Sequence, residues 1–109
     1  MKIAIIGSTA LAVKMHMHRM ELENAGYEVR LPVFDSSGLD ELGILTANRD
    51  SIEWADVVHV FWDQRSIGTM FDFGMTFALR KPLKIVYLEP KTFSNAMRQY
   101  AAACERITL

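Results

Sequence analysis

Short apolar segments alternate with longer amphipathic segments along the whole chain. Ile3 to Ile6 form a continuous apolar run, which is typical of a strand buried on both faces of a parallel sheet. From Ala10 to Asn24 apolar residues recur at helical spacing, and Gly26 supplies the glycine that commonly ends a helix. The pattern predicts strands over 3–6, 27–31, 57–62 and 83–88, an edge strand over 107–109, and helices over 10–24, 40–47, 51–54, 69–79 and from Thr92 or Ser94 to 103.

This alternation predicts a single doubly wound α/β domain of the flavodoxin-like or Rossmann-like type. We expect about five mostly parallel strands in the order 2-1-3-4-5, a number that suits a chain of 109 residues. In that order ligands bind between strands 1 and 3, at the carboxyl ends of the strands. The loops over 7–11 and 62–68 flank this crevice, so we expect Ser8, Asp63 and Asp72 to converge there.

Two acidic residues are the strongest candidates for chemistry. Asp72 follows Thr69 by three residues near the start of a predicted helix, which is the spacing of a capping box and has a purely structural explanation. Gly74 argues for more than a cap, because a glycine inside a helix costs about 1 kcal/mol and predicts a close approach by a neighbour or a ligand. Asp63 directly follows a strand, where it is either a turn residue or a group over the crevice.

Small polar residues follow the first strand. Gly7, Ser8 and Thr9 can hold an anion at a helix N-terminus, or one of the hydroxyls can simply cap the helix. The chain contains neither a dinucleotide-binding glycine fingerprint nor a phosphate-binding P-loop. Trp62, at the end of a strand, is either a core residue or a platform for stacking a base or ring.

Net charge, cysteine content and histidine spacing limit the kinds of ligand and the cellular compartment that the sequence favours. A net charge of -1 gives no electrostatic reason for binding nucleic acid or an anionic membrane. Cys104 is the single cysteine, which fits a reducing, cytoplasmic location. His16 and His18 point to different sides of a helix, and His59 is expected to be a buried, partnered strand residue, so we predict no metal and no cofactor.

Several segments together resemble the nucleoside 2-deoxyribosyltransferase family, which includes the small 2'-deoxynucleoside 5'-phosphate N-hydrolases. They are Ala55-Asp56-Val57-Val58, then Gly68 to Met75, then Ala78-Leu79-Arg80-Lys81-Pro82. The opening Ile6-Gly7-Ser8 and the step from Ala25 to Val29 are also similar. Family members carry a run of the type G-x-x-x-E-x-G, and Gly68 to Gly74 match it with aspartate in place of glutamate.

The resemblance implies roles for particular residues. In the family the glutamate attacks the anomeric carbon of deoxyribose and displaces the base, so Asp72, with a side chain one methylene shorter, is the implied nucleophile. Ser66 stands where an acidic residue is common, and the resemblance places Ser66, Gly68 and Met70 in the substrate site. Asp63 would then orient the substrate or donate a proton.

The last predicted helix adds an implied contact with a second subunit. Its sequence from Phe93 to Arg98 is similar to a family segment that reaches the neighbouring active site, so Ser94 or Arg98 could contact a 5'-phosphate in a homo-oligomer. A helix-capping serine and a solvated arginine explain the same residues without function. Three hypotheses result: an enzyme that cleaves or exchanges the N-glycosidic bond, an inactive nucleotide-binding module, and a flavin-binding module that uses Trp62.

Overall fold

Four parallel strands pair in the order β2-β1-β3-β4 in the computed structural model, which describes residues 1–34, 37–90 and 93–108. The predicted α/β class and relative strand order are confirmed, but the expected fifth strand is wrong. Ile107 and Thr108 belong to the last helix, and Leu109 lies outside the described residues. The elements in chain order are β1 (Lys2–Gly7), η1 (Thr9–Leu11), α1 (Ala12–Asn24), β2 (Glu28–Arg30), α2 (Glu41–Trp54), β3 (Val57–Trp62), α3 (Ile67–Ala78), β4 (Leu83–Leu88) and α4 (Phe93–Thr108).

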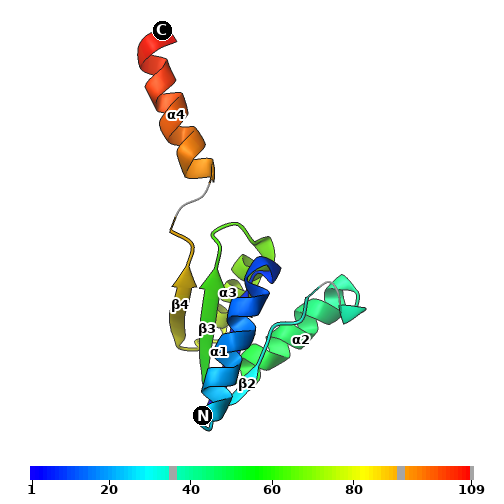
Figure 1. Ribbon diagram of the computed structural model, residues 1–109. Coiled ribbons are helices and arrows are strands. Elements are labelled where there is room, and N and C mark those ends of the chain that lie inside the picture. Colours follow the sequence, from blue (N-terminus) through cyan, green and yellow to red (C-terminus); the bar gives the residue numbers. More distant parts are fainter. Residues whose placement is uncertain (35–36, 91–92, 109) are drawn as a thin grey trace.

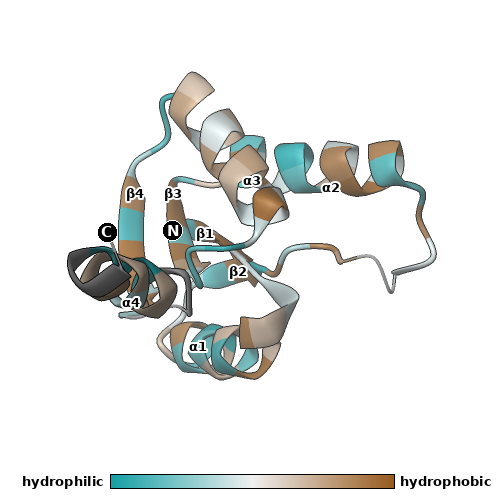
Figure 2. Ribbon diagram, turned by 90° about the horizontal axis from the view of Figure 1, so that it is seen from above, coloured by the Kyte–Doolittle hydropathy of each residue, from teal (hydrophilic) through white to brown (hydrophobic). Residues whose placement is uncertain are grey.

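Helices cover both faces of the central strands, with α1 on one face and α2 and α3 on the other (Figure 2). Because β1 and β3 lie between neighbours and under helices, their side chains are buried on both faces, which explains their continuous apolar runs. One core cluster joins the sheet to α2, and the other joins it to η1 and α1. The first contains Ala4, Ile6, Ile52, Ala55, Val58 and Val60, and the second contains Ile5, Leu11, Met15 and Phe61.

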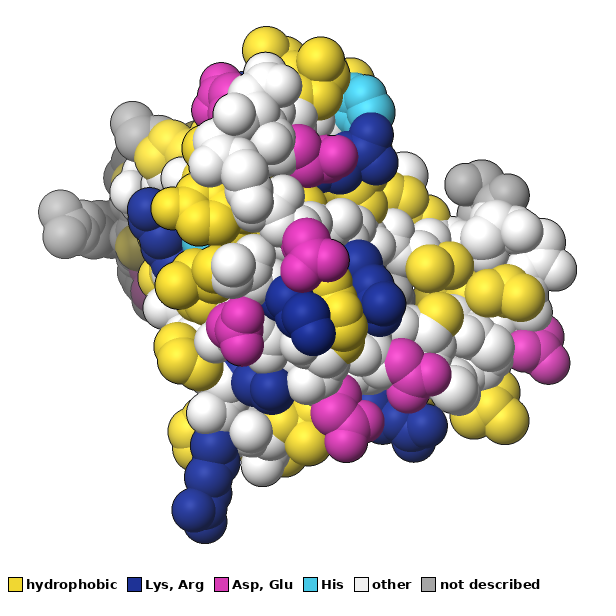
Figure 3. Space-filling model, turned by 90° about the horizontal axis from the view of Figure 1, so that it is seen from below, with side chains coloured by type: hydrophobic (Ala, Val, Ile, Leu, Met, Phe, Trp, Pro, Cys, Tyr) yellow, Lys and Arg dark blue, Asp and Glu magenta, His cyan; other side chains and the backbone are white. Residues whose placement is uncertain are grey.

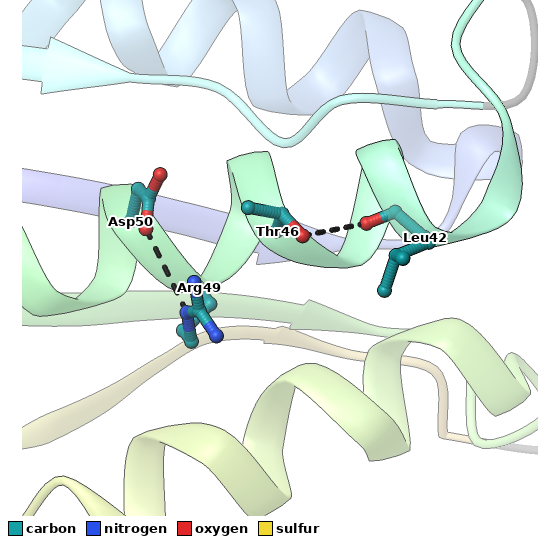
Figure 4. A network of polar contacts seen from close by, with 4 residues as sticks. All are labelled: Leu42, Thr46, Arg49 and Asp50. Carbon is teal, nitrogen blue, oxygen red and sulfur yellow. Dashed lines mark hydrogen bonds and ion pairs between the residues drawn. The ribbon is translucent and has the colours of Figure 1, made fainter.

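Helix boundaries differ from the predicted ones for local reasons. The two predicted pieces over 40–47 and 51–54 form one helix, α2, whose N-cap Asp40 accepts a hydrogen bond from the amide of Gly43 at 2.7 Å. Along α2 the Thr46 hydroxyl donates a hydrogen bond to the Leu42 carbonyl at 2.7 Å (Figure 4). Nε of Arg49 lies 3.6 Å from Oδ1 of Asp50 in an exposed ion pair (Figure 4). Ile52 faces the core, whereas the Leu42 side chain near the start of α2 is exposed.

The two ends of the sheet are different. At the amino ends of the strands, basic and acidic side chains are interspersed with hydrophobic ones (Figure 3). There the Lys81 ammonium donates to the carbonyls of Glu53 and Ala55, both at 2.8 Å, and this ties the end of α3 to the end of α2. The opposite, carboxyl end carries the loops after β1, β2 and β3, where the candidate site lies.

The last helix stands apart from the layers. α4 extends beyond the carboxyl end of the sheet, away from the other helices (Figure 1), and the molecule measures 58 × 31 × 27 Å. It begins at Phe93; the alternative start at Thr92 falls outside the described residues. In the described part of the chain no helix has the length and apolarity required to cross a membrane.

Candidate functional site

A hollow of about 180 Å³ opens at the carboxyl end of the sheet, next to the point where strand order reverses. The loop after β1 and the start of α3 form its polar wall, and the segment after β2 together with α2 forms its more apolar wall. Its lining comprises Gly7, Thr9, Pro32, Val33, Phe34, Ile44, Leu45, Asn48, Ser66, Gly68, Thr69 and Asp72.

Asp72 places a carboxylate in this hollow. Asp72 is only 5% exposed. Among the described residues no hydrogen bond or ion pair to its carboxylate is present. Burial raises the pKa of Asp72 from 3.8 to about 6, because the charged form loses solvation that no protein group replaces. The carboxylate therefore ionises only as the pH approaches neutrality.

The expectation that Asp72 caps its helix is wrong. α3 begins at Ile67, and Ser66 is the N-cap, whose hydroxyl accepts a hydrogen bond from the Thr69 amide at 3.2 Å. Asp72 therefore lies in the second turn, beyond the first turn in which the positive end of a helix dipole is effective. Burial, and not the helix dipole, therefore determines the pKa of Asp72.

Asp63 adopts the turn role that its position after β3 allowed. One carboxylate oxygen accepts hydrogen bonds from the amides of Arg65 and Ser66, both at 2.9 Å. Burial alone would raise the pKa of Asp63, but these amides and the Ser8 hydroxyl stabilise its charge, so its pKa lies below the usual value. Asp63 does not line the hollow, and an ionised carboxylate of this kind is a poor proton donor.

The residues after β1 have different roles beside the hollow. The Ser8 hydroxyl accepts a hydrogen bond from the Ala10 amide at 3.2 Å and so caps η1, while Gly7 and Thr9 line the hollow itself. A Cβ on Gly7 would lie 2.6 Å from the sulfur of Met15 and 2.8 Å from the carbonyl of Phe61. Packing alone therefore requires glycine at this position.

The other predicted site residues divide between two places. Ser66 and Gly68 line the hollow beside Asp72, whereas Trp62 and Met70 line a separate apolar groove on the other side of α3. Ser94 and Arg98 lie on α4, which extends away from the hollow within this chain (Figure 1).

Gly74 is not a point of close approach. A Cβ added there would have no neighbour within 4 Å, so neither the sheet nor another element of this chain requires the glycine.

The sequence did not predict the apolar wall, and it singled out the wall's anchor, Asn48, only as an approximate counterpart, with Asp50, of an aspartate that similar family members carry before the segment at 55–58. The Asn48 carboxamide is buried; it accepts from the Val33 amide at 2.7 Å and donates to the Val33 carbonyl at 3.2 Å. It thereby fixes the segment after β2 against α2. The signal available in the sequence was an asparagine on the side of α2 that carries apolar residues toward the core.

Histidines form a pair away from the hollow. His18 and His59 share a hydrogen bond of 2.8 Å between ring nitrogens, which confirms that His59 is buried and partnered. Burial, followed by the charges of His18 and Lys84, lowers the pKa of His59 to about 4. Within the described residues no group of three or more metal-binding side chains is present.

Comparison with known proteins identifies a shared fold. No protein-family model matches the chain, and no curated protein matches it by sequence. Among solved structures, the Clostridium botulinum CMP N-glycosidase BcmB is similar over 91% of this chain and 82% of its own, with a TM-score of 0.59 and 18% sequence identity. A nucleotide N-glycosidase thus has the fold described above.

Proposed function

We propose that this protein cleaves the N-glycosidic bond of a 2'-deoxynucleoside or its 5'-monophosphate, with Asp72 as the nucleophile. The observation that carries the proposal is the buried Asp72 carboxylate, which lines the hollow at the carboxyl end of the sheet and has no hydrogen-bond partner in the part of the chain that the structure describes. The CMP N-glycosidase with the same fold supports this class of reaction, as does the match of Gly68 to Gly74 to the deoxyribosyltransferase pattern.

The chemistry requires an ionised carboxylate and a leaving base. An Asp72 oxygen attacks the anomeric carbon, the bond from that carbon to the base nitrogen breaks, and the base leaves with the electron pair and takes a proton from solvent. Water then attacks the sugar ester, which releases the sugar and restores the carboxylate; a second base in place of water would make the reaction a transfer. A pKa of about 6 leaves Asp72 largely ionised at neutral pH.

The walls of the hollow suit the two halves of such a substrate. Val33, Phe34 and Leu45 offer apolar surface to a planar base, and Thr9 and Ser66 offer hydroxyls to a sugar or phosphate. Asp63 would hold the loop that carries Ser66 in place through its two amide hydrogen bonds.

Release of free base tests the proposal directly. The purified protein is incubated with each deoxynucleoside and each 5'-monophosphate, and free base is measured by chromatography. Asp72→Asn should lower the rate by at least about 10⁴-fold, because it removes the nucleophile while keeping the side-chain volume. Asp50→Asn, an exposed aspartate on α2, is the matched control and should leave the rate unchanged.

Two results would contradict the proposal. Full activity of Asp72→Asn would remove Asp72 from the mechanism. No base release from any substrate, together with thermal stabilisation by a nucleotide, would instead favour the inactive nucleotide-binding module.

A further inference from the structure

A second buried polar group lines the hollow with Asp72 and has no part in the chemistry described above. Thr69 is only 2% exposed, and its hydroxyl oxygen has no hydrogen-bond partner among the described residues. A hydroxyl buried in this way loses its hydrogen bonds to water and gains none in return, which lowers the stability of the free protein. An unpaired group of this kind calls for an explanation, and a bound molecule would supply the missing partner.

No hydrogen bond holds the Thr69 hydroxyl in one orientation. In helices a threonine hydroxyl commonly donates to a carbonyl three or four residues earlier, as Thr76 on the same helix donates to the Asp72 carbonyl at 2.8 Å. Thr69 makes no such bond. Its side chain lines both the hollow beside Asp72 and the apolar groove on the other side of α3. Rotation about its Cα–Cβ bond exchanges the methyl and the hydroxyl, so the hydroxyl can turn toward the hollow without breaking a hydrogen bond.

Thr69 and Asp72 are neighbours on one side of α3. Residues three apart in a helix have Cβ atoms about 5–6 Å apart, and both of these residues are buried. This spacing is comparable to the width of a furanose ring with its contacts. A sugar held against Asp72 would therefore bring another of its substituents to Thr69.

The stereochemistry of the proposed reaction identifies that substituent. In a β-2'-deoxynucleoside the base projects from one face of the sugar, and the 3'-hydroxyl projects from the opposite face. A carboxylate that displaces the base attacks C1' from the face opposite the base. Asp72 would therefore approach the face that carries the 3'-hydroxyl, which is the only hydroxyl on that face of a 2'-deoxyribose.

We propose that the Thr69 hydroxyl forms a hydrogen bond with the 3'-hydroxyl of the substrate sugar and so positions C1' against Asp72. This contact rests on the proposed function, since it assumes that Asp72 attacks the sugar. Binding would give the buried hydroxyl the partner that it lacks in the free protein, so Thr69 favours substrates that carry a 3'-hydroxyl.

A substrate that lacks the 3'-hydroxyl tests this contact. The probes are the best substrate among the 2'-deoxynucleosides and their 5'-monophosphates, and the 2',3'-dideoxy compound with the same base. Thr69→Val removes the hydroxyl and keeps the shape of the side chain, so it should lower kcat/KM about tenfold for the deoxy compound and less than about twofold for the dideoxy compound. Thr69→Ser keeps the hydroxyl and should remain within about threefold of wild type.

Thermal unfolding of the free protein separates this role from a structural one. Thr69→Val should raise the unfolding temperature by about 4 °C, because it removes a buried hydroxyl that has no partner. A threonine needed only for packing would instead give a less stable variant with equal losses for both compounds. Thr46→Val is the matched control and should leave kcat/KM unchanged, since Thr46 lies on α2 outside the hollow and its hydroxyl donates to the Leu42 carbonyl.

Failure of this contact and failure of the proposed function give different results. If the wild-type protein releases base and Asp72→Asn does not, but Thr69→Val affects both compounds equally or neither, the contact is wrong and the proposed function stands. If the wild-type protein releases no base, the proposed function fails, and calorimetric binding of the four 2'-deoxynucleoside 5'-monophosphates and their dideoxy counterparts decides the contact. Tighter binding of a deoxy compound that Thr69→Val abolishes would support it; equal binding of both compounds, or no binding, would overturn it.

Discussion

Two aspartates follow β3: Asp63 lies in the loop after the strand, and Asp72 lies in α3. Their surroundings are opposite. Asp63 is surrounded by donors: two loop amides and the Ser8 hydroxyl stabilise its charge and lower its pKa. Asp72, nine residues later, is buried with no hydrogen-bond partner within the described ranges, and its pKa rises to about 6. The comparison teaches that a carboxylate with good hydrogen bonds holds its loop in shape, and it is why the proposal assigns the reaction to the carboxylate without them.

The largest expected effect that separates the two is on the pH dependence of base release. Because the proposed mechanism needs Asp72 ionised, the rate should approach a tenfold fall per pH unit well below pH 6, and should be about 50-fold lower at pH 4 than at pH 6. The measurement is kcat/KM against pH, which reports ionisation of the free protein, with circular dichroism at each pH. A rate that is flat down to pH 4 in a folded protein would mean that Asp72 is not the titrating group.

Asp72→Asn should make the folded protein more stable at neutral pH. The folded-state pKa lies above the value of 3.8 for an unfolded chain, so the wild-type protein loses stability as pH rises from about 4 to about 6 and does not regain it above that. At 1.36 kcal/mol per pKa unit, the variant should gain roughly 2–3 kcal/mol at pH 7 and much less at pH 4. Urea unfolding at both values measures this, and equal effects at both would contradict it.

Asp63→Ala should have the opposite effect and lower the free energy of unfolding. Removing the carboxylate leaves the amides of Arg65 and Ser66 without their acceptor, which should cost about 1–3 kcal/mol of unfolding free energy at neutral pH. In the wild-type protein this contribution is lost as pH falls through the lowered pKa of Asp63. Unfolding in urea at pH 7 provides the measurement, and a variant as stable as wild type would show that the loop needs no such anchor.

The smallest expected effect is that of Gly74→Ala on α3, one half-turn past Asp72. Since a Cβ there meets no neighbour and alanine favours helix, unfolding free energy should rise by up to about 1 kcal/mol. Gly26→Ala is the matched control and should lose stability, because Gly26 has a φ of +94°. Thermal unfolding compares the two, and a destabilised Gly74→Ala variant would reveal a partner that approaches α3.

Much of the fold was predictable because its signals are local. The apolar runs over 57–62 and 83–88 are strands with those bounds, and their parallel pairing follows from the intervening helices. The errors occurred where local pattern was weakest: at the chain end, which continues α4 instead of forming a strand, and at the start of α3, where Ser66 rather than Thr69 is the cap.

The candidate site was only partly predictable. Sequence reasoning placed Gly7, Thr9, Ser66 and Asp72 at one end of the sheet, and the hollow contains all four. It could not anticipate the wall anchored by Asn48, because that wall depends on α2 packing against the segment after β2.

By itself the sequence determined the order of the four paired strands, the alternation of strands and helices, and the place of both aspartates after β3, since these depend on side-chain periodicity and on residues adjacent in the chain. Only the tertiary structure decided which aspartate is satisfied and which is not. Desolvation and hydrogen bonding depend on how closely distant segments pack, and the same packing leaves Trp62 and Met70 in the apolar groove on the other side of α3 and not beside Asp72.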